Sequence, residues 1–576
     1  MYILGISCYY HDAAACLIKD GKLIAAAEEE RFTRKKHDSS FPINAIDFCL
    51  KEANISSKEL SFIGFYEKPL LKFERILSQH LEMFPYSFWS FYKTIPNWLS
   101  EKLRIPKIIK KKLKYKGDIL FIDHHLAHAT SSFLVSPFKE AAILTVDGVG
   151  EWTTTAIGYG KENEIGLLKE IKFPHSLGLL YSTVTAHLGF SVNNSEYKIM
   201  SLAAYGNPVY YDKFMKIIDL KEDGSYRLDM DFFDYHYRLR MPSKNFIKEF
   251  GPIRKPSEKI THHHKDIAAS LQKVTEVIMF KILNHLYEIT KCNNLCMAGG
   301  VALNSVANGK IKKYTKFKNV FIQPASSDAG TSLGVAFYIY NSVLNNKRDY
   351  VMNNVYLGPN FSYDEIKIFL NSNGINYQEF KDDKELIKEV AKLIFGNNVV
   401  GWFQGRMEFG PRALGNRSIL ANPCNPQMKK ILNEKVKHRE EFRPFAPVII
   451  EEKVKEYFDI DKKDEKFMLF VYPVKESKRK LIPAVTHVDG TARLQTVNKN
   501  QNLLYHNLIM EFEKLSKVPV LINTSFNIRG EPIVCTPEDA YRCMMGTEID
   551  YLVLSNFLIK RNNNLKDVWS SEKYED

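Results

Sequence analysis

The feature that most constrains the fold is a strand, a polar turn and a second strand, in a pattern that occurs twice. In the first copy, residues 2–9 form an apolar strand, and Asp20-Gly21 separates two further apolar runs. An Asp-Gly pair between apolar runs is a strong signal for a β-hairpin. In the second copy, a strand over residues 142–146 enters a glycine-rich turn that begins at Asp147, and further strands follow up to residue 171. The repeat predicts a duplicated α/β core whose halves face each other across a cleft.

Two later segments place a glycine-rich turn between a strand and a helix. Residues 296–305 contain Gly299 and Gly300, and residues 324–334 contain Asp328. Backbone amides at the start of a helix bind anions and nucleotides, and glycine lets them approach a phosphate closely. Each turn can also be an ordinary helix start, with Asp328 as a cap. Because both turns fall in one α/β unit, they predict nucleotide binding, and Asp328 is a candidate metal or phosphate residue.

Residues 123–129 read Asp-His-His-Leu-Ala-His-Ala and place two histidines four positions apart. If the segment is helical, His124 and His128 leave the same face, and two neutral imidazoles on one face commonly begin a transition-metal site. His125 lies about a third of a turn away and is expected to be a neighbour, not a ligand. The alternative is an ordinary helix start capped by Asp123. Acidic residues in the glycine-rich turns can complete a metal shell.

Two other groups of possible metal ligands have an unsuitable spacing. His262, His263 and His264 are consecutive at the start of a predicted helix, where neighbouring side chains diverge by about 100°. We therefore expect them to be exposed. The eight cysteines show no paired spacing, and free thiols in a reducing cytosol are the simplest interpretation.

A stretch rich in aromatic residues and lysine, residues 67–117, separates the two copies of the repeat. Basic residues interleaved with aromatic ones can bind single-stranded nucleic acid. Such stretches more often form amphipathic helices, and we expect a helical insertion here. The charged run over residues 28–37 is also ambiguous, because it is either a surface run or, beside the first turn, a substrate contact.

The length of the chain limits the number of domains, and its net charge limits the class of ligand. A chain of 576 residues is too long for one core, and a polar break at residues 345–349 separates expected domains over 1–348 and 349–576. The net charge of +13 fits an anionic substrate, nucleic acid or a membrane surface, or simply lysine-rich solvated faces. The N-terminus lacks the basic region of a signal peptide, and no apolar window reaches about 20 residues, so we expect a cytoplasmic protein without a membrane span.

The second domain concentrates arginine in turns. Residues 399–417 contain three arginines in a loop rich in glycine and proline. Further cations and polar groups follow at Lys435, Lys437, Arg439, Arg443, Arg493 and residues 523–530. Guanidinium groups match the geometry of phosphate oxygens, so the set predicts a pocket for a polyanion. Scattered surface arginines are the alternative, although these do not usually lie between glycine and proline.

Together these motifs resemble the O-carbamoyltransferases that decorate nodulation factors and antibiotics. The matching stretches follow one another through nearly the whole chain, at residues 11–14, 124–128, 147–148, 196–206, 299–304, 327–330, 405–417, 439–447 and 523–530. The resemblance is therefore far more specific than one glycine motif, and only residues 67–117 have no place in it.

The resemblance implies an α/β protein in two parts. The N-terminal domain would have the actin-like ATPase superfold with duplicated α/β halves, and would be similar to the threonylcarbamoyl-transfer subunit of tRNA modification. The C-terminal domain would have a YrdC-like α/β fold that makes carbamoyl adenylates. These parts correspond to residues 1–348 and 349–576.

The resemblance also implies roles for individual residues. The expected ligands of a divalent metal are His124, His128, Asp147 and Asp328. Two histidines and two aspartates suit a first-row ion, and iron(II) is expected. His11 would face the acceptor or the carbamoyl group. The expected cofactor-binding residues are Gly148, Gly299, Gly300 and Asn304. The expected site for carbamoyl phosphate and ATP comprises Arg412, Lys437, Arg443, Arg493 and Ser525.

The implied chemistry has two steps. The C-terminal domain would convert carbamoyl phosphate and ATP, with its Mg²⁺, to carbamoyl adenylate, and the N-terminal domain would transfer the carbamoyl group to a hydroxyl of a sugar-containing or other small acceptor. Two anionic substrates then explain much of the net charge, and no nucleic-acid or membrane partner is expected. Two alternatives stay open: a tRNA-modifying carbamoyl- or threonylcarbamoyl-type transferase, favoured by the basic charge and the aromatic stretch, and a non-catalytic nucleotide sensor. Neither the acceptor nor the oligomeric state follows from the sequence.

Overall fold

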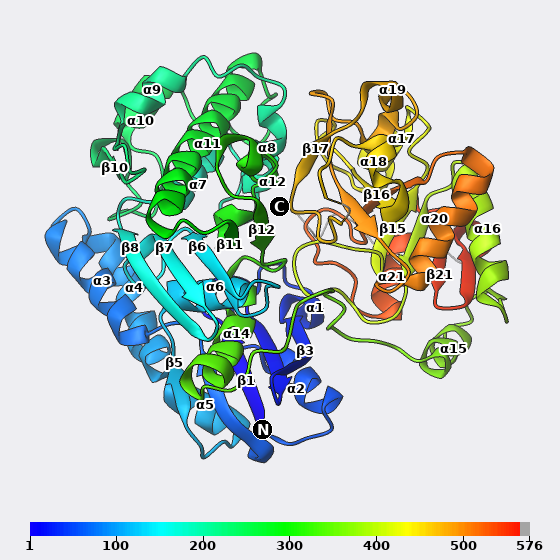
Figure 1. Ribbon diagram of the computed structural model, residues 1–576, viewed down its shortest axis with the longest axis horizontal. Coiled ribbons are helices and arrows are strands. Elements are labelled where there is room, and N and C mark those ends of the chain that lie inside the picture. Colours follow the sequence, from blue (N-terminus) through cyan, green and yellow to red (C-terminus); the bar gives the residue numbers. More distant parts are fainter. Residues whose placement is uncertain (463, 565–576) are drawn as a thin grey trace. The chain divides into compact units, whose positions relative to one another are not determined.

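The computed structural model describes residues 1–462 and 464–564 (Figure 1). The chain divides into two compact units. The first unit comprises Met1–Glu29 and His37–Met352, and the second comprises Glu30–Lys36 and the chain from Asn353. No helix in the described part of the chain is both long enough and apolar enough to cross a membrane.

The first unit begins with a five-stranded mixed sheet in the order β3-β2-β1-β4-β5. Its strands are β1 (Tyr2–Ser7), β2 (Ala14–Lys19), β3 (Lys22–Glu28), β4 (Leu60–Phe65) and β5 (Ile119–Phe121). Strands β1, β2 and β3 pair antiparallel, whereas β4 and β5 continue in parallel from β1. The predicted hairpin at Asp20-Gly21 is confirmed, and both residues have the positive φ that a tight hairpin turn requires.

The second sheet repeats this arrangement. Its strands are β6 (Glu140–Val146), β7 (Thr153–Lys161), β8 (Glu164–Lys172), β11 (Asn294–Ala298) and β12 (Asn319–Ile322). Read as β8-β7-β6-β11-β12, the sheet has the same order and the same antiparallel and parallel pairs as the first. This duplication is the core of the actin-like ATPase superfold, so the predicted fold class is confirmed.

Two helices lie between the sheets and carry the residues of interest. Helix α14 (Asp328–Phe337) packs on β1 and β2, α6 (His124–Phe133) packs on β6 and β11, and the two helices pack against each other. Their close approach requires glycine, because a Cβ at Gly334 would lie 2.0 Å from the carbonyl oxygen of Ala127. Helix α2 (Ile43–Glu52) packs on β2 and β3, while α7 (Leu177–His187) and α11 (His262–Thr290) pack on the strands of the second sheet.

The predicted helical insertion is confirmed. Residues 67–117 form α3 (Pro69–Glu82), α4 (Phe88–Ser100) and α5 (Ile105–Leu113). Their inner faces bury Ile76, Trp98 and Ile109, while Trp89 and Tyr92 remain exposed. The remaining helices of the unit are α8 (Glu196–Ala203), α9 (Tyr211–Lys216), α10 (Lys244–Phe250), α12 (Ser305–Asn308) and α13 (Ile311–Tyr314).

The expectation that three consecutive histidines are exposed is correct only for His262. The His263 ring is half-buried and lies within hydrogen-bond distance of the Tyr210 hydroxyl and the Phe250 carbonyl oxygen. The His264 ring accepts a hydrogen bond from the backbone N–H of Thr261 and so caps α11. The helix start therefore uses these rings in packing and capping.

The second unit is built on an eight-stranded mixed sheet in the order β13-β22-β21-β14-β15-β20-β16-β19. Its strands are β13 (Gln378–Glu379), β14 (Val400–Phe403), β15 (Arg417–Ala421), β16 (Ala446–Ile450), β19 (Gln495–Val497), β20 (Val520–Ser525), β21 (Tyr551–Leu554) and β22 (Phe557–Lys560). A separate pair is formed by β17 (Val471–Pro473) and β18 (Thr491–Arg493). The alternation of strand side chains divides the core into two.

Each side of this sheet is covered by helices. Val400 and Trp402 of β14 pack with residues of α16 (Asp383–Phe395) and α20 (Leu503–Ser516). Phe403 belongs to the other cluster, with residues of α15 (Tyr363–Ser372) and α21 (Pro537–Met545). The second unit is thus a separate α/β unit, with further short helices α17 (Met428–Ile431), α18 (Val454–Tyr457) and α19 (Glu476–Arg479).

The charged run after the first hairpin has a role that neither sequence interpretation anticipated. Its helix α1 (Glu30–Thr33) belongs to the second unit. Arg31 is buried and donates to the Gly410 carbonyl oxygen, while Arg34 donates to the carbonyl oxygens of Pro532 and Ile533. Residues 30–36 of the run are therefore an integral part of that unit.

Candidate metal centre and cationic cluster

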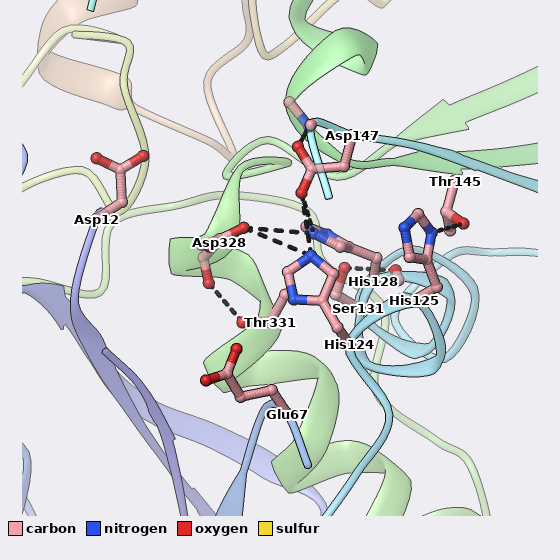
Figure 2. Close-up of polar contacts among 12 residues, drawn as sticks. Asp12, Glu67, His124, His125, His128, Ser131, Thr145, Asp147, Asp328 and Thr331 are labelled. Atoms are coloured by element: carbon pink, nitrogen blue, oxygen red, sulfur yellow. Dashed lines mark hydrogen bonds and ion pairs between the residues drawn. The ribbon is translucent and has the colours of Figure 1, made fainter. Parts of the chain in front are cut away.

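Four potential metal ligands from three segments meet in the first unit (Figure 2). His124 and His128 lie on the first turns of α6, Asp147 follows the last residue of β6, and Asp328 is the first residue of α14. One donor atom from each lies within 4.8 Å of every other donor, and all four side chains are buried. The structure thus brings together the four residues that the sequence motifs singled out.

Asp147 and Asp328 contact both imidazoles. Oδ2 of Asp147 lies 3.0 Å from Nε2 of His124 and 3.4 Å from Nε2 of His128. Oδ1 of Asp328 lies 3.8 Å and 3.6 Å from the same two nitrogens. Because all the donors converge on one small volume, they can act on a single cation.

The hydrogen bonding of these residues fits a bound metal ion. Apart from the ion-pair contacts just given, both carboxylate oxygens of Asp328 and both ring nitrogens of His128 are buried without a hydrogen-bond partner among the described residues. Buried polar atoms are almost always hydrogen-bonded, so such a group needs an explanation. Two nitrogen and two oxygen donors suit a first-row divalent ion. Asp328 is not the cap of α14, because Ser327 is the N-cap residue of that helix. Asp123 is the N-cap residue of α6, but its side chain pairs with Lys68 and makes no capping hydrogen bond.

Electrostatics within the cluster favour charged side chains. Burial alone would lower the pKa of His128, but Asp147 and Asp328 outweigh it and raise the pKa to about 9. Burial would raise the pKa of Asp147, but the two histidines hold it well below its usual range. Without a metal, the cluster is therefore stabilised by protonated imidazole beside carboxylate.

Neighbouring groups hold the ligands in place. Glu151 accepts hydrogen bonds from the backbone N–H of His124 at 3.1 Å, and the backbone N–H of Gly300 donates to Oδ1 of Asp147 at 3.1 Å. His125 turns away, with its Nδ1 2.7 Å from the Thr145 hydroxyl, as expected of a neighbour. Sequence reasoning missed Glu151, although it lies in the same glycine-rich turn as Asp147 and that proximity was the available signal.

The second unit holds a cluster of cations. Burial and the guanidinium groups of Arg412, Arg439 and Arg443 place the pKa of Arg493 well below its usual range. Nε of Arg493 is buried without a hydrogen-bond partner among the described residues. Arg443 pairs with Glu440 at 3.6 Å. Several positive charges therefore converge, which is the electrostatic environment that an anion requires.

Lys437 links this cluster to the end of β20. Its buried ammonium group donates to the backbone oxygen of Ser525, to the backbone oxygen of Asn527 at 3.0 Å and to Oδ1 of Asn527 at 2.8 Å. The Ser525 hydroxyl in turn donates to Oδ1 of Asn527 at 2.8 Å. Burial, Arg439 and Arg443 lower the pKa of Lys437 well below its usual value. The lysine therefore fixes the loop that carries Ser525 beside the arginines.

Comparison with known families accounts for both units. A family model described as the carbamoyltransferase N-terminus matches residues 2–337, and another, described as the carbamoyltransferase C-terminus, matches residues 391–561. The chain belongs to the carbamoyltransferase family. It is therefore a transferase.

Relatives of this carbamoyltransferase cover almost its whole length. Protein sll1178 of Synechocystis sp. is 49% identical, covering 97% of this chain and 97% of its own. Nodulation protein NolNO of Sinorhizobium fredii is 39% identical over 98% of this chain and 81% of its own, and nodulation protein NolO of Bradyrhizobium diazoefficiens is 37% identical over 78% and 81%. The chain is thus related over both units to proteins named for nodulation.

Solved structures show more distant likenesses. HypF of T. kodakarensis is 14% identical, with a TM-score of 0.31 over 59% of this chain and 47% of that one. Component A of the Acidaminococcus fermentans (R)-2-hydroxyglutaryl-CoA dehydratase is 12% identical, with a TM-score of 0.30 over 59% and 98%. The fold of this carbamoyltransferase is therefore assigned from its own strand order.

His11 lies near the candidate metal ligands. Its ring centroid is 4.7 Å from that of Tyr10, and its Nδ1 is 3.3 Å from Oδ2 of Asp12. Burial would lower the pKa of His11, but Asp328 and Asp12 raise it to about 10. His11 is therefore within the electrostatic field of the His/Asp cluster, and its predicted role toward the carbamoyl group stays a prediction.

The glycine turns and Asn304 have structural roles in addition to any role toward a nucleotide. Gly299 has a φ of +93°, and a Cβ there would lie 2.3 Å from the carbonyl oxygen of Val146. The Asn304 amide exchanges two hydrogen bonds with Gln272 and accepts a third from the backbone N–H of Ala307. Helix α12, which follows, has only four residues. The predicted binding of a cofactor by Gly148, Gly299, Gly300 and Asn304 stays a prediction.

The three arginines of the loop over residues 405–417 have different roles. Arg417 is fully buried and donates to the backbone oxygens of Gln404, Gly405, Asn416 and Pro359. Arg406 donates to the backbone oxygens of Leu357 and Gly358. Lys435, another predicted member of the cation set, pairs with Glu548 at the surface. Of the loop arginines, the one that influences Arg493 is Arg412, so the interpretation of the whole loop as an anion pocket is too broad.

Proposed function

We propose that this protein is an ATP-dependent O-carbamoyltransferase. Its second unit converts carbamoyl phosphate and ATP to carbamoyl adenylate, and its first unit transfers the carbamoyl group to a hydroxyl of a sugar-containing or other small acceptor. The observation that carries the proposal is the division of two chemistries between the units: a buried His₂Asp₂ group in the first, and a cluster of cations around Arg493 in the second.

In the activation step, carbamoyl phosphate, ATP and one water give carbamoyl adenylate, phosphate and pyrophosphate. The reactants are polyanions, and Mg²⁺ accompanies ATP. Arg412, Arg443 and Arg493 neutralise their charge and orient them through paired N–H donors. Lys437 holds the loop of Ser525 and Asn527 in place through its backbone contacts.

In the transfer step, which the first unit holds, the acceptor hydroxyl oxygen bonds to the carbamoyl carbon, the bond from that carbon to the adenylate phosphate oxygen breaks, and AMP leaves. His124, His128, Asp147 and Asp328 are the proposed ligands of an iron(II) ion, which when bound supplies Lewis-acid polarisation of the carbamoyl carbonyl. His11 is the proposed acceptor of the proton from the attacking hydroxyl. With a pKa raised to about 10, His11 holds its own proton at neutral pH. Asp328 is a main cause of that shift. A cation held by Asp328 would neutralise its carboxylate, which would lower the pKa of His11 and enable His11 to act as the base.

The test of this function is to measure both half-reactions in full-length protein supplied with iron(II), ATP and carbamoyl phosphate. Pyrophosphate release reports activation. Mass spectrometry of a pool of sugars, with tRNA as a separate acceptor, reports transfer as the addition of one carbamoyl group. His128→Ala should still release pyrophosphate but should carbamoylate nothing. If folded His128→Ala protein also fails to consume ATP, the metal group belongs to activation and the proposed division is wrong.

A further inference from the structure

Helix α3 turns charged side chains inward. Lys72 and Arg75 are 4% and 5% exposed, whereas Leu70 and Leu81 of the same helix are 74% and 64% exposed. A surface helix normally buries its apolar residues and exposes its charges. A sequence that breaks this rule does so most often at a functional site. The inward face of α3 is therefore a candidate binding surface.

Arg75 has no polar partner in the part of the chain that the structure describes. Its Nε is buried without a hydrogen bond, and no ion pair or hydrogen bond joins its guanidinium to residues 1–462 or 464–564. The contact that it does make is with Phe173, whose ring centroid lies 4.8 Å from the guanidinium carbon. Stacking on an aromatic ring leaves the N–H groups at the edge of the guanidinium plane available to a ligand.

Other buried arginines in this chain do have partners. Arg254, which is also 5% exposed, donates to the backbone oxygens of Leu188, Lys255 and Glu258. Arg417 donates to four backbone oxygens. Arg31 bonds a backbone oxygen and pairs with Glu30. These three buried guanidinium groups thus have hydrogen-bond partners within the chain. Arg75 differs from them because no hydrogen bond or ion pair joins its guanidinium group to the described residues.

The carboxylates that influence Arg75 are already engaged. Burial lowers the pKa of Arg75 to about 10, and Glu67 and Glu151 act against that shift. Glu67 pairs with Lys72. Glu151 accepts hydrogen bonds from the backbone N–H groups of Lys68 and His124. A buried cation that lacks a close anion destabilises the fold, so its retention indicates an anion from outside the chain.

The surroundings of Arg75 connect it to the metal ligands. Tyr10 is influenced both by Arg75 and by the proposed metal ligands. Burial, Asp147 and Asp328 raise the pKa of Tyr10, and Arg75 lowers it. The Tyr10 ring lies 4.8 Å from the ammonium group of Lys72 and 4.7 Å from the His11 ring. A Cβ at Gly148, next to Asp147, would lie 3.8 Å from the Tyr10 hydroxyl. A ligand beside His11 and Asp147 is thus close to the inward face of α3.

We infer that Arg75 binds an oxyanion, a carboxylate or a phosphate, of a ligand that occupies the first unit beside Tyr10 and His11. The inference rests on the proposed function in placing the transfer reaction there. Such an oxyanion can come from an acidic group on the hydroxyl acceptor, such as that of a uronic acid or a sugar phosphate. It can also be the phosphate of carbamoyl adenylate. Both sources present the same chemistry to the guanidinium group.

The test is a binding experiment on full-length protein that requires no turnover. The parent is Arg493→Ala, which weakens the cation cluster of the second unit. Arg75→Met retains a long apolar side chain over Phe173 and removes the charge, and Arg104→Met removes an exposed cation from the same insertion. Calorimetry measures the affinities for inorganic phosphate, glucuronate, glucose and AMP, and thermal unfolding measures the Tm without ligand.

Arg75→Met should weaken phosphate binding by roughly ten- to a hundredfold, because a charged hydrogen-bonded contact is lost, and Arg104→Met should not. Without ligand, the Tm of Arg75→Met should be unchanged or higher, because an unpaired buried charge has been removed. Weaker binding of glucuronate, with glucose and AMP unaffected, assigns the oxyanion to the acceptor. Weaker binding of AMP assigns it to the adenylate.

The inference is overturned if the parent binds none of the anions, or if phosphate affinity is the same in Arg75→Met and the parent. A lower Tm with unchanged affinity would show Arg75 to be purely structural. If Arg75→Met does not fold, Arg75→Lys decides, because it retains the charge but not the planar fork: weaker phosphate binding supports the inference, and parental affinity overturns it. Failure to find carbamoyl transfer would contradict the proposed function but leave these affinities interpretable.

Discussion

Glu531 offers a direct test of how burial shifts the pKa of a carboxyl group in the second unit. Its side chain is 7% exposed and follows the loop of Ser525 and Asn527, whose amide donates to the Glu531 backbone oxygen. Burial raises the pKa of the Glu531 carboxyl to about 7, and Arg34 only partly offsets this effect. Arg34 is occupied by the backbone oxygens of Pro532 and Ile533 and by Asp539. The folded protein thus holds a proton on Glu531 that the unfolded chain loses near pH 4.5.

The sign of the effect follows from proton linkage. Between the unfolded and the folded pKa, the folded state binds more protons, so stability falls as pH rises and the loss is complete above about pH 7. From about pH 5.5 to about pH 7 the loss is 1.5 units at about 1.36 kcal/mol each, or about 2 kcal/mol. Glu531→Gln, which mimics the neutral acid, should remove this loss.

The assay is denaturant unfolding of wild type and Glu531→Gln at about pH 5.5 and about pH 8. The stability advantage of Glu531→Gln should be about 2 kcal/mol larger at the higher pH. Glu538→Gln, which removes an exposed carboxylate of α21, should show the pH dependence of wild type. An equal stability advantage of Glu531→Gln at the two pH values would refute the reasoning, because Glu531 of the folded protein would then be ionised at both pH values.

Three further outcomes are expected. A His124→Ala, His128→Ala double variant should lose nearly all bound first-row metal by elemental analysis, and undiminished metal in the folded variant would refute the assignment. Arg493→Ala should slow phosphate release from carbamoyl phosphate by roughly 30- to 1000-fold, without acceptor present, as expected for loss of a charge-assisted contact worth about 2–4 kcal/mol; a wild-type rate would contradict its proposed role. Arg417→Met should lower the free energy of unfolding by at least about 3 kcal/mol, because four backbone oxygens lose their donor, and a smaller change would show that water replaces the guanidinium group.

Local patterns predicted the parts of the structure that local forces determine. The Asp20-Gly21 hairpin and the repeated strand order follow from turn chemistry and apolar runs. The helical spacing of His124 and His128 and the glycine-rich turn of Asp328 indicated a possible metal site, and the family resemblance implied the full set of four ligands.

Other features depend on which way a side chain points after packing, which a single sequence does not determine. Arg412 and Arg417 lie in the same glycine-rich loop, yet Arg412 joins the cation cluster and Arg417 bonds backbone oxygens. The insertion was predicted to be helical, but the sequence did not show that α3 exposes Leu70 and buries Arg75. The orientation of such side chains is determined by contacts with distant parts of the chain, so it cannot be predicted from the local sequence.

The membership of residues 30–36 in the second unit has a consequence for synthesis of the chain. This segment leaves the ribosome early, but Gly410, Pro532 and Ile533, whose carbonyl oxygens bond its arginines, are made only after the whole of the first unit. Domains generally fold in order as they emerge. Here the second unit cannot be completed from its own contiguous stretch, so a fragment that begins at residue 353 should lack a helix that the full-length chain supplies from its N-terminal end.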